Sequence, residues 1–145
     1  MRRVNLYPNP HFDPDGATTG AWGIDYSGDM PGDGTLHPSF SQGFDELKIP
    51  ELEPGAEYVF SVRSENGAGA IAIWSAENLR PYTRPDGDGL IYIRFRAPES
   101  GSQSTNRVVF TNSGVYSKPQ LELAETYDSA GGGLRFFSGD LMPLG

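Results

Sequence analysis

Short runs of alternating apolar and polar residues, each closed by Gly, Pro, Asn or Asp, constrain this chain more than any other feature. Residues 57–65 read EYVFSVRSE and residues 89–98 read GLIYIRFRAP, so that apolar side chains recur at every second position. A period of two is typical of a β-strand that buries one face. The runs therefore predict strands that pack on one side against a core.

Similar runs cover most of the chain and are separated by turn residues. They occupy residues 34–42, 44–50, 57–65, 70–75, 89–98, 106–114 and 115–125. The one candidate helix, residues 75–82, contains Pro81 and is predicted to be a loop or a single turn. With 19 Gly and 12 Pro in 145 residues, the pattern predicts one all-β sandwich of two antiparallel sheets with about eight or nine strands.

Composition and charge exclude several classes of function. The net charge is −8 and cysteine is absent, so we expect no nucleic-acid partner and no disulfide. No run approaches the roughly 20 apolar residues of a membrane span, so we expect no membrane insertion. His11 and His37 are the only histidines, and neither a Ser-His-Asp frame nor a Gly-Lys-Ser/Thr phosphate loop is visible. We therefore expect no enzyme, no catalytic residue and no required cofactor.

Three stretches resemble a known family. NLYPNPHFDPDGATTGAW (residues 5–22) resembles the opening of carbohydrate-binding-module-like jelly rolls, and IPELEPGAEYVFSVRSE (residues 49–65) is similar to the turn that enters their central strand. SKPQLELAETYDSAGGGLRFFSGD (residues 117–140) is similar to the ends of such domains in minor tail proteins of actinobacterial phages. The resemblance implies a jelly roll whose first loop packs under the sandwich. It also implies a protein made in the host cytoplasm and located in the virion.

The resemblance leads to one expected function and a rival. The first is a structural or accessory phage virion protein of the tail, which binds other virion proteins or copies of itself. The rival is a carbohydrate-binding adhesion module that recognises a host-surface glycan, and the two are compatible. A third reading, a fragment of a glycan hydrolase, lacks a visible catalytic frame.

A candidate binding patch follows from the strand faces. If Ile91, Ile93 and Phe95 point into the core, Tyr92, Arg94 and Arg96 point away from it, and Trp74 does so on its own strand. We predict that Trp74, Tyr92, Arg94 and Arg96 form one exposed patch. Such a patch suits either a pyranose ring or a protein interface, because Trp, Tyr and Arg are enriched in interfaces.

Asp13 and Asp15 form the candidate metal site. Their spacing allows both carboxylates to reach one calcium ion. The resemblance implies a structural calcium at the acidic residue that follows the N-terminal Phe, which is Asp13, although Gln120 stands in the last strand where an acidic residue is common. The alternative is that Asp13 and Asp15 only form Asx-turns.

The C-terminal segment is predicted to be separate from the sandwich. We place the sandwich at residues 1–126, followed by a Gly-rich hinge and an apolar docking tail at residues 127–145. The predicted assembly residues of this tail are Leu134, Phe136, Phe137, Leu141 and Met142. They are too apolar to remain in water, so we expect docking onto a neighbouring subunit, or else folding back as a final edge strand of the same domain.

Overall fold

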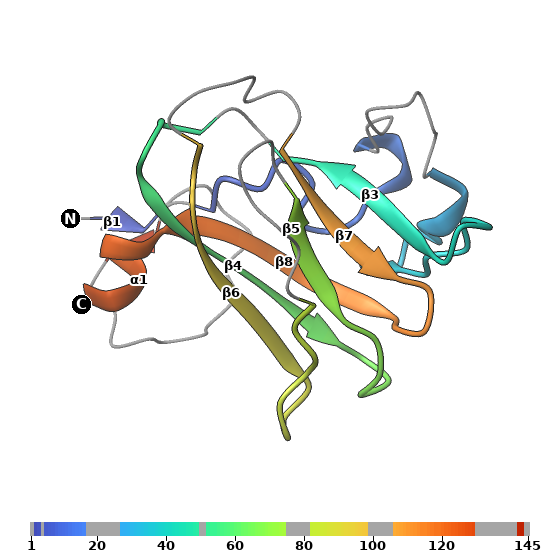
Figure 1. The fold of residues 1–145 in the computed structure, drawn as a ribbon. Helices are drawn as coiled ribbons and strands as arrows, with labels where there is room; N and C mark the ends of the chain where they lie inside the picture. Colours follow the sequence, from blue (N-terminus) through green and yellow to red (C-terminus); the bar gives the residue numbers. More distant parts are fainter. Residues whose placement is uncertain are drawn as a thin grey trace.

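Seven strands form a sandwich of two antiparallel sheets in the computed structural model, which describes residues 2–3, 5–16, 27–49, 52–74, 82–98, 106–129 and 142–143 (Figure 1). The four-stranded sheet has the order β2 (Thr35–Leu36), β8 (Tyr116–Leu123), β4 (Glu57–Ser64), β6 (Leu90–Arg96). The three-stranded sheet has the order β3 (Phe44–Lys48), β7 (Arg107–Thr111), β5 (Ile71–Trp74). The predicted all-β sandwich is confirmed.

The chain winds between the sheets as a jelly roll does. Consecutive strands from β2 to β8 alternate between the four-stranded and the three-stranded sheet. Beside β5, Thr83 makes a single antiparallel bridge, in which its N–H donates to the Ile71 carbonyl at 2.8 Å and its carbonyl accepts from the Ile71 N–H at 3.0 Å. This bridge occupies the place of an eighth strand. Pro81 and Pro85 flank it and lack the donors that a longer ladder needs.

The strand count therefore differs from the prediction. The two sheets hold seven strands rather than eight or nine. Two further strands of two residues each, β1 (Arg2–Arg3) and β9 (Met142–Pro143), pair with each other and form a separate ladder.

Aromatic rings from both sheets and from the N-terminal loop meet in the core. Phe60 of β4 and Phe110 of β7 lie edge to face with centroids 6.2 Å apart. Phe12 contacts Phe110 at 6.0 Å, and Tyr7 contacts Phe60 at 5.7 Å. Phe12 is fully buried, so the proline-rich opening is an ordered loop that supplies core residues.

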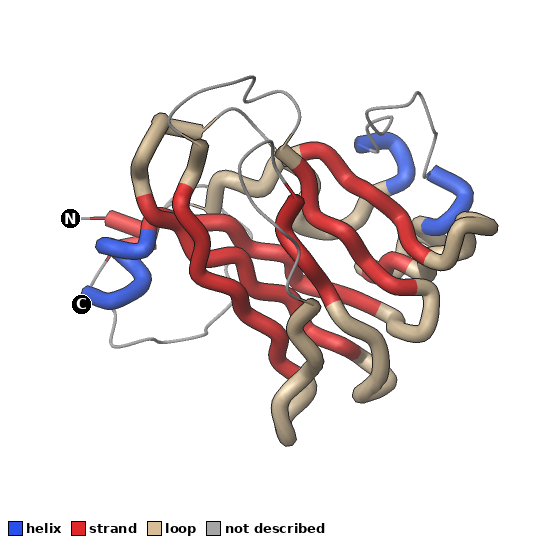
Figure 2. The backbone as a smooth tube through the Cα atoms, in the orientation of Figure 1, coloured by secondary structure: helices blue, strands red, loops and turns tan. Residues whose placement is uncertain are grey.

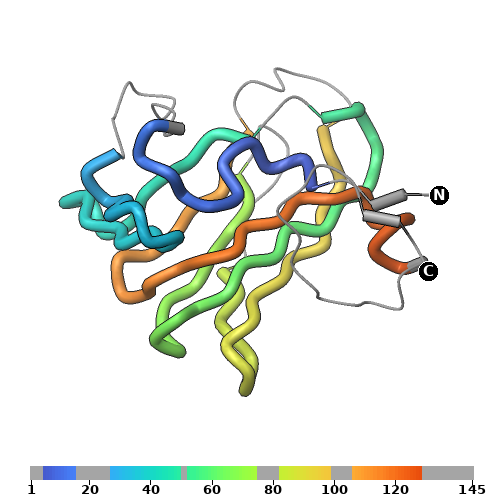
Figure 3. The backbone as a smooth tube through the Cα atoms, turned by 180° about the vertical axis from the view of Figure 1, so that it is seen from behind, coloured from blue at the N-terminus to red at the C-terminus, as the bar shows by residue number. Residues whose placement is uncertain are grey.

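Local hydrogen bonds hold that loop in place. The Asn9 side chain accepts from the Asp13 N–H and donates to the Asp13 carbonyl, both at 3.0 Å. These two hydrogen bonds hold the loop in a conformation in which Phe12 has a positive φ of 46° and its ring lies in the core. Upstream, the Leu6 N–H donates to the Leu121 carbonyl, so the N-terminal segment runs beside β8 (Figure 3).

An α-helix, α1 (Ala124–Ser129), follows β8 directly and covers part of the four-stranded sheet (Figure 2). The other helical segments among the described residues are the 3₁₀ turns η1 (Pro14–Gly16) and η2 (Ser27–Asp29). Ala124 and Tyr127 of α1 form a small buried cluster with Val59 on the outer face of β4. The predicted domain boundary at residue 126 falls inside this helix.

Hydrogen bonds connect three neighbouring turns at the end of the sandwich far from α1. The Asn66 side chain donates to the Ser113 carbonyl at 3.1 Å and accepts from the Val115 N–H at 3.2 Å. The Ser64 N–H donates to the Gly89 carbonyl at 2.7 Å. We call the turns at residues 65–69, 86–89 and 112–115 the distal turns. The paired strands β1 and β9 lie at the opposite end, beside α1 (Figure 1).

Candidate ligand-binding surface

The outer face of the four-stranded sheet holds three of the four predicted patch residues. Ile91 and Ile93 of β6 are buried, and Tyr92, Arg94 and Arg96 are exposed, as the alternation predicts. Trp74 lies in β5, which belongs to the three-stranded sheet. The structure therefore does not bring Trp74 together with the other three residues.

Trp74 packs against a buried ion pair of its own sheet. The Arg107 guanidinium lies 4.5 Å from the centroid of the Trp74 ring, and Arg107 Nη1 is 3.2 Å from Glu46 Oε2. Both charged side chains are buried, and breaking such a pair by removing one partner is costly. Within this arrangement Trp74 covers a cation of the protein itself, which is a structural role.

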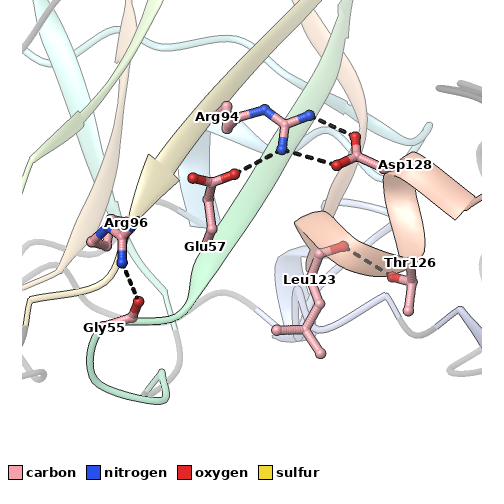
Figure 4. A network of polar contacts seen from close by, with 7 residues as sticks. All are labelled: Gly55, Glu57, Arg94, Arg96, Leu123, Thr126 and Asp128. Atoms are coloured by element: carbon pink, nitrogen blue, oxygen red, sulfur yellow. Dashed lines mark hydrogen bonds and ion pairs between the residues drawn. The ribbon is translucent and has the colours of Figure 1, made fainter.

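The two arginines of the patch are engaged in intramolecular contacts (Figure 4). Arg94 bridges two carboxylates, with Nη1 2.8 Å from Glu57 Oε1 and Nη2 2.6 Å from Asp128 Oδ1. This contact lowers the pKa of Asp128 and raises the pKa of Arg94. Arg96 Nη1 donates to the Gly55 carbonyl at 2.9 Å.

Both arginines of the predicted patch therefore have a structural role. Arg94 ties α1 to β4 and β6, and Arg96 holds the turn before β4. Their donors are directed at groups of the same chain, so a ligand would have to compete for them. Tyr92, with 49% of its surface exposed, is the predicted patch residue that presents a large open surface.

A pocket lies on the same face, beyond the part that α1 covers, and sequence reasoning missed it. It has a volume of about 120 Å³, and its lining includes Ser61, Arg63, Leu90, Lys118 and Gln120 from β4, β6 and β8. Tyr92 lies next to it, because Tyr92 is paired with Ser61 across the strands. Three strands thus line one concavity, with polar side chains from β4 and β8 and apolar ones from β6.

A β-bulge shapes this pocket. Ser61 pairs with Gln120 but Arg63 pairs with Ser117, so β8 contains one extra residue at Lys118–Pro119. Lys118 has a φ of 57°, which is uncommon for a residue other than glycine, and its side chain is exposed. The signal available in the sequence was Lys-Pro inside an otherwise regular strand, because proline within a sheet is confined to edges and bulges.

Gln120 is held in a fixed orientation at the pocket. Its Nε2 donates to Glu122 Oε1 at 3.1 Å, and Glu122 Oε2 accepts from the Thr126 hydroxyl at 2.9 Å. The carboxylate accepts only, so the amide nitrogen must face it. The Gln120 carbonyl oxygen is left buried with no hydrogen-bond partner among the described residues.

Asp13 and Asp15 lie exposed in the N-terminal loop. Asp13 Oδ1 accepts from the Asp15 N–H at 3.0 Å, which is the Asx-turn of the alternative interpretation. Within the described part of the chain, no group of three or more His, Cys, Asp or Glu side chains is arranged to hold a metal ion.

A buried carboxylate elsewhere was also missed. Asp45 at the start of β3 is fully buried; its Oδ1 accepts from the Phe40 N–H at 3.3 Å, and its Oδ2 has no partner among the described residues. Asp29 lies beside it and accepts from the N–H and hydroxyl of Ser39. Burial, reinforced by the neighbouring Asp29, raises the pKa of Asp45 to about 8.

The predicted assembly tail falls mostly outside the described residues. Leu134, Phe136, Phe137 and Leu141 lie there, whereas the backbone of Met142 pairs with Arg3 of the same chain. This pairing is in line with the alternative in which the tail returns to its own domain.

Comparison with known proteins adds no family to this picture. No family model matches the chain, and no curated protein sequence matches it. Among the described residues, no helix is long and apolar enough to cross a membrane.

Proposed function

We propose that this protein is a non-catalytic structural or accessory component of a phage virion, located in the tail and acting by binding. The resemblance of residues 5–22, 49–65 and 117–140 to jelly rolls of phage minor tail proteins motivates the proposal. The jelly-roll winding of the two sheets agrees with it. A fold alone does not define a function, so the proposal needs support from the surface.

The observation that carries this proposal is that β1 and β9 lie at one end of the sandwich and the distal turns at the other. β1 and β9 pair with each other near α1, and the distal turns lie at the other end (Figure 1). The corner formed by β1, β9 and α1 can attach the domain to an assembly and leave the far end for contacts. The hydrogen bonds of Asn66 hold that far end in one shape, so a partner would bind it without first ordering it.

Immunogold electron microscopy of purified particles tests this role. An antibody against the chain is applied to virions of the phage that encodes it, with a known capsid protein as the reference label. We expect gold on the tail. Abundant chain in the infected-cell lysate, with no label on particles and no peptide in their mass spectrum, would contradict the proposal.

A second candidate function, contact with a glycan of the host surface, is favoured by the pocket between β4, β6 and β8. Sugar sites combine planar polar groups with an aromatic surface. Ser61 and Arg63 supply the polar groups, and the half-exposed Tyr92 lies beside them. A glycan array with the isolated protein tests this candidate, and the absence of any bound glycan counts against it.

A further inference from the structure

The pocket on the outer face of the four-stranded sheet combines two cationic side chains with a buried acceptor. Arg63 and Lys118 both line it. Lys118 has no hydrogen bond or ion pair with any described residue, and the one ion pair found for Arg63 is a loose contact of 3.8 Å between its Nε and Glu65 Oε1. In a protein of net charge −8, this is a local site for an anion.

Two carboxylates, Glu65 and Glu122, lie near the residues of the pocket. Glu65 is bonded to the Ser117 hydroxyl as well as lying near Arg63. Glu122 is buried and bonded to Gln120 and Thr126. Both carboxylates keep their charge, but they are hydrogen-bonded to Ser117, Gln120 and Thr126 and neither lines the pocket. Arg63 and Lys118 are therefore the charged side chains in the pocket lining.

The neutral groups of the pocket specify what else the ligand carries. The Gln120 amide nitrogen is committed to Glu122 and its carbonyl oxygen is buried, so neither atom is open to a ligand. The Ser61 hydroxyl can donate or accept. Leu90 and the adjacent Tyr92 ring offer apolar surface for C–H groups.

The backbone at Lys118 also indicates a built site. A φ of 57° is unfavourable for a non-glycine residue, because its Cβ crowds the following carbonyl oxygen. Such strain is retained where the surrounding structure or a function requires it. Here the bulge directs the lysine out of the regular strand alternation and to the pocket wall.

We propose that this pocket binds a single acidic sugar residue, a hexuronic acid, through its carboxylate at Arg63 and Lys118 and through a hydroxyl at Ser61. The volume of about 120 Å³ suits part or all of one ring, rather than a long chain. Arg63 meets the carboxylate in the planar geometry that guanidinium favours. The inference rests on the second, glycan-contacting candidate and leaves the structural role in the virion independent.

Titration by two-dimensional NMR tests the inference directly, with sodium glucuronate as the probe and glucose and sodium acetate as matched comparisons. We expect saturable shifts at Ser61, Tyr92 and Gln120 with a dissociation constant on the order of 1 mM, the value reasonable for a ligand of this size. Glucose and acetate each lack one half of the recognised chemistry, so both should bind at least tenfold more weakly.

Three variants locate the site. Arg63→Gln and Lys118→Gly should each weaken glucuronate binding about tenfold, the loss expected for one charge-assisted hydrogen bond. Glycine suits the positive φ at residue 118, so this variant keeps the fold. Lys48→Gln, which removes an exposed cation of β3, is the control and should bind as the unaltered protein does.

Several results would overturn the inference. These are no saturation by glucuronate, equal binding of glucose or acetate, or an equal loss in the Lys48→Gln variant. Equal binding of glucose would leave the glycan candidate standing without its acidic specificity. Gold label on the tail together with no glucuronate binding would remove the pocket's role and keep the virion proposal.

Discussion

Replacing Asp45 by asparagine should stabilise the protein at neutral pH. Asp45 is buried beside Asp29, and both burial and this neighbour raise the pKa of the Asp45 carboxyl. We therefore expect the Asp45 carboxyl to hold a proton at neutral pH, on the Oδ2 that has no hydrogen-bond partner among the described residues. In the asparagine variant an amide N–H replaces that O–H, and Oδ1 still accepts from the Phe40 N–H.

The sign of the pH dependence follows from the two pKa values. The pKa of Asp45 is about 8 in the folded protein, against about 3.9 in an unfolded chain. The folded state therefore holds more protons between about pH 4 and pH 8, and the free energy of unfolding falls as the pH rises through that window. Three pH units at about 1.4 kcal/mol each give an upper limit of about 4 kcal/mol at pH 7.

Thermal melts at pH 5, 7 and 9 measure this effect. We expect a gain of about 1–2 kcal/mol for Asp45→Asn at pH 7, because the amide does not reproduce every contact. For a chain of this length that gain raises Tm by roughly 3–8 °C. The gain should grow at pH 9 and shrink at pH 5.

Exposed Asp33 provides the control, since the Thr35 hydroxyl lowers its pKa. Asp33→Asn should leave the fall in stability from pH 5 to pH 9 intact. Two results would show that Asp45 is not protonated in the folded protein. One is an Asp45→Asn variant that melts at a lower temperature than the unaltered protein at pH 9, and the other is a variant whose stability falls with pH as steeply as that of the unaltered protein. Calcium that raises the Tm of the unaltered protein but not of Asp45→Asn would also contradict the protonated carboxyl, because a cation would then lie where we place the proton.

Three further predictions address the loop, the core and the tail. Chelator should leave Tm unchanged, because Asp13 is bonded to the Asp15 N–H; a rise with excess calcium would restore the metal site. Gly114→Ala should lower the free energy of unfolding by about 2 kcal/mol or more in a denaturant titration, because its Cβ would lie 2.5 Å from the Tyr116 ring. Gly87→Ala, whose Cβ would meet open space, is the control and should change the free energy of unfolding little. Deleting residues 131–145 should abolish virion incorporation without lowering Tm if the tail docks on a neighbouring subunit. If size-exclusion chromatography shows a monomer and the deletion lowers its Tm by a large amount, the tail covers its own domain instead.

The sequence predicts the faces of the strands well and their neighbours poorly. Alternation assigns Tyr58, Phe60 and Val62 to the core because a strand has a period of two whatever surrounds it. The same alternation turns Trp74 and Tyr92 outward, yet it carries no information on which sheet each strand joins. One predicted patch therefore became two separate surfaces.

Long-range partners were the other information that periodicity could not supply. Arg94 meets Asp128, which is 34 residues away, only because α1 folds back over β4. Asp45, in contrast, left a readable signal. It shares a face with Leu47 and Ile49 in a short strand pattern, so a carboxylate occupies a position where the alternation calls for an apolar side chain.

The contacts of Arg94 also limit what the outer face of the four-stranded sheet can bind. Arg94 joins β6 to Glu57 of β4 and to Asp128 of α1, and Val59 is buried beneath the helix. A partner that uses the whole face must displace α1, break these ion pairs and expose Val59 again. A ligand confined to the pocket beyond the helix requires none of this. The half of the sheet between α1 and the distal turns is therefore the part that can bind without rearranging the fold.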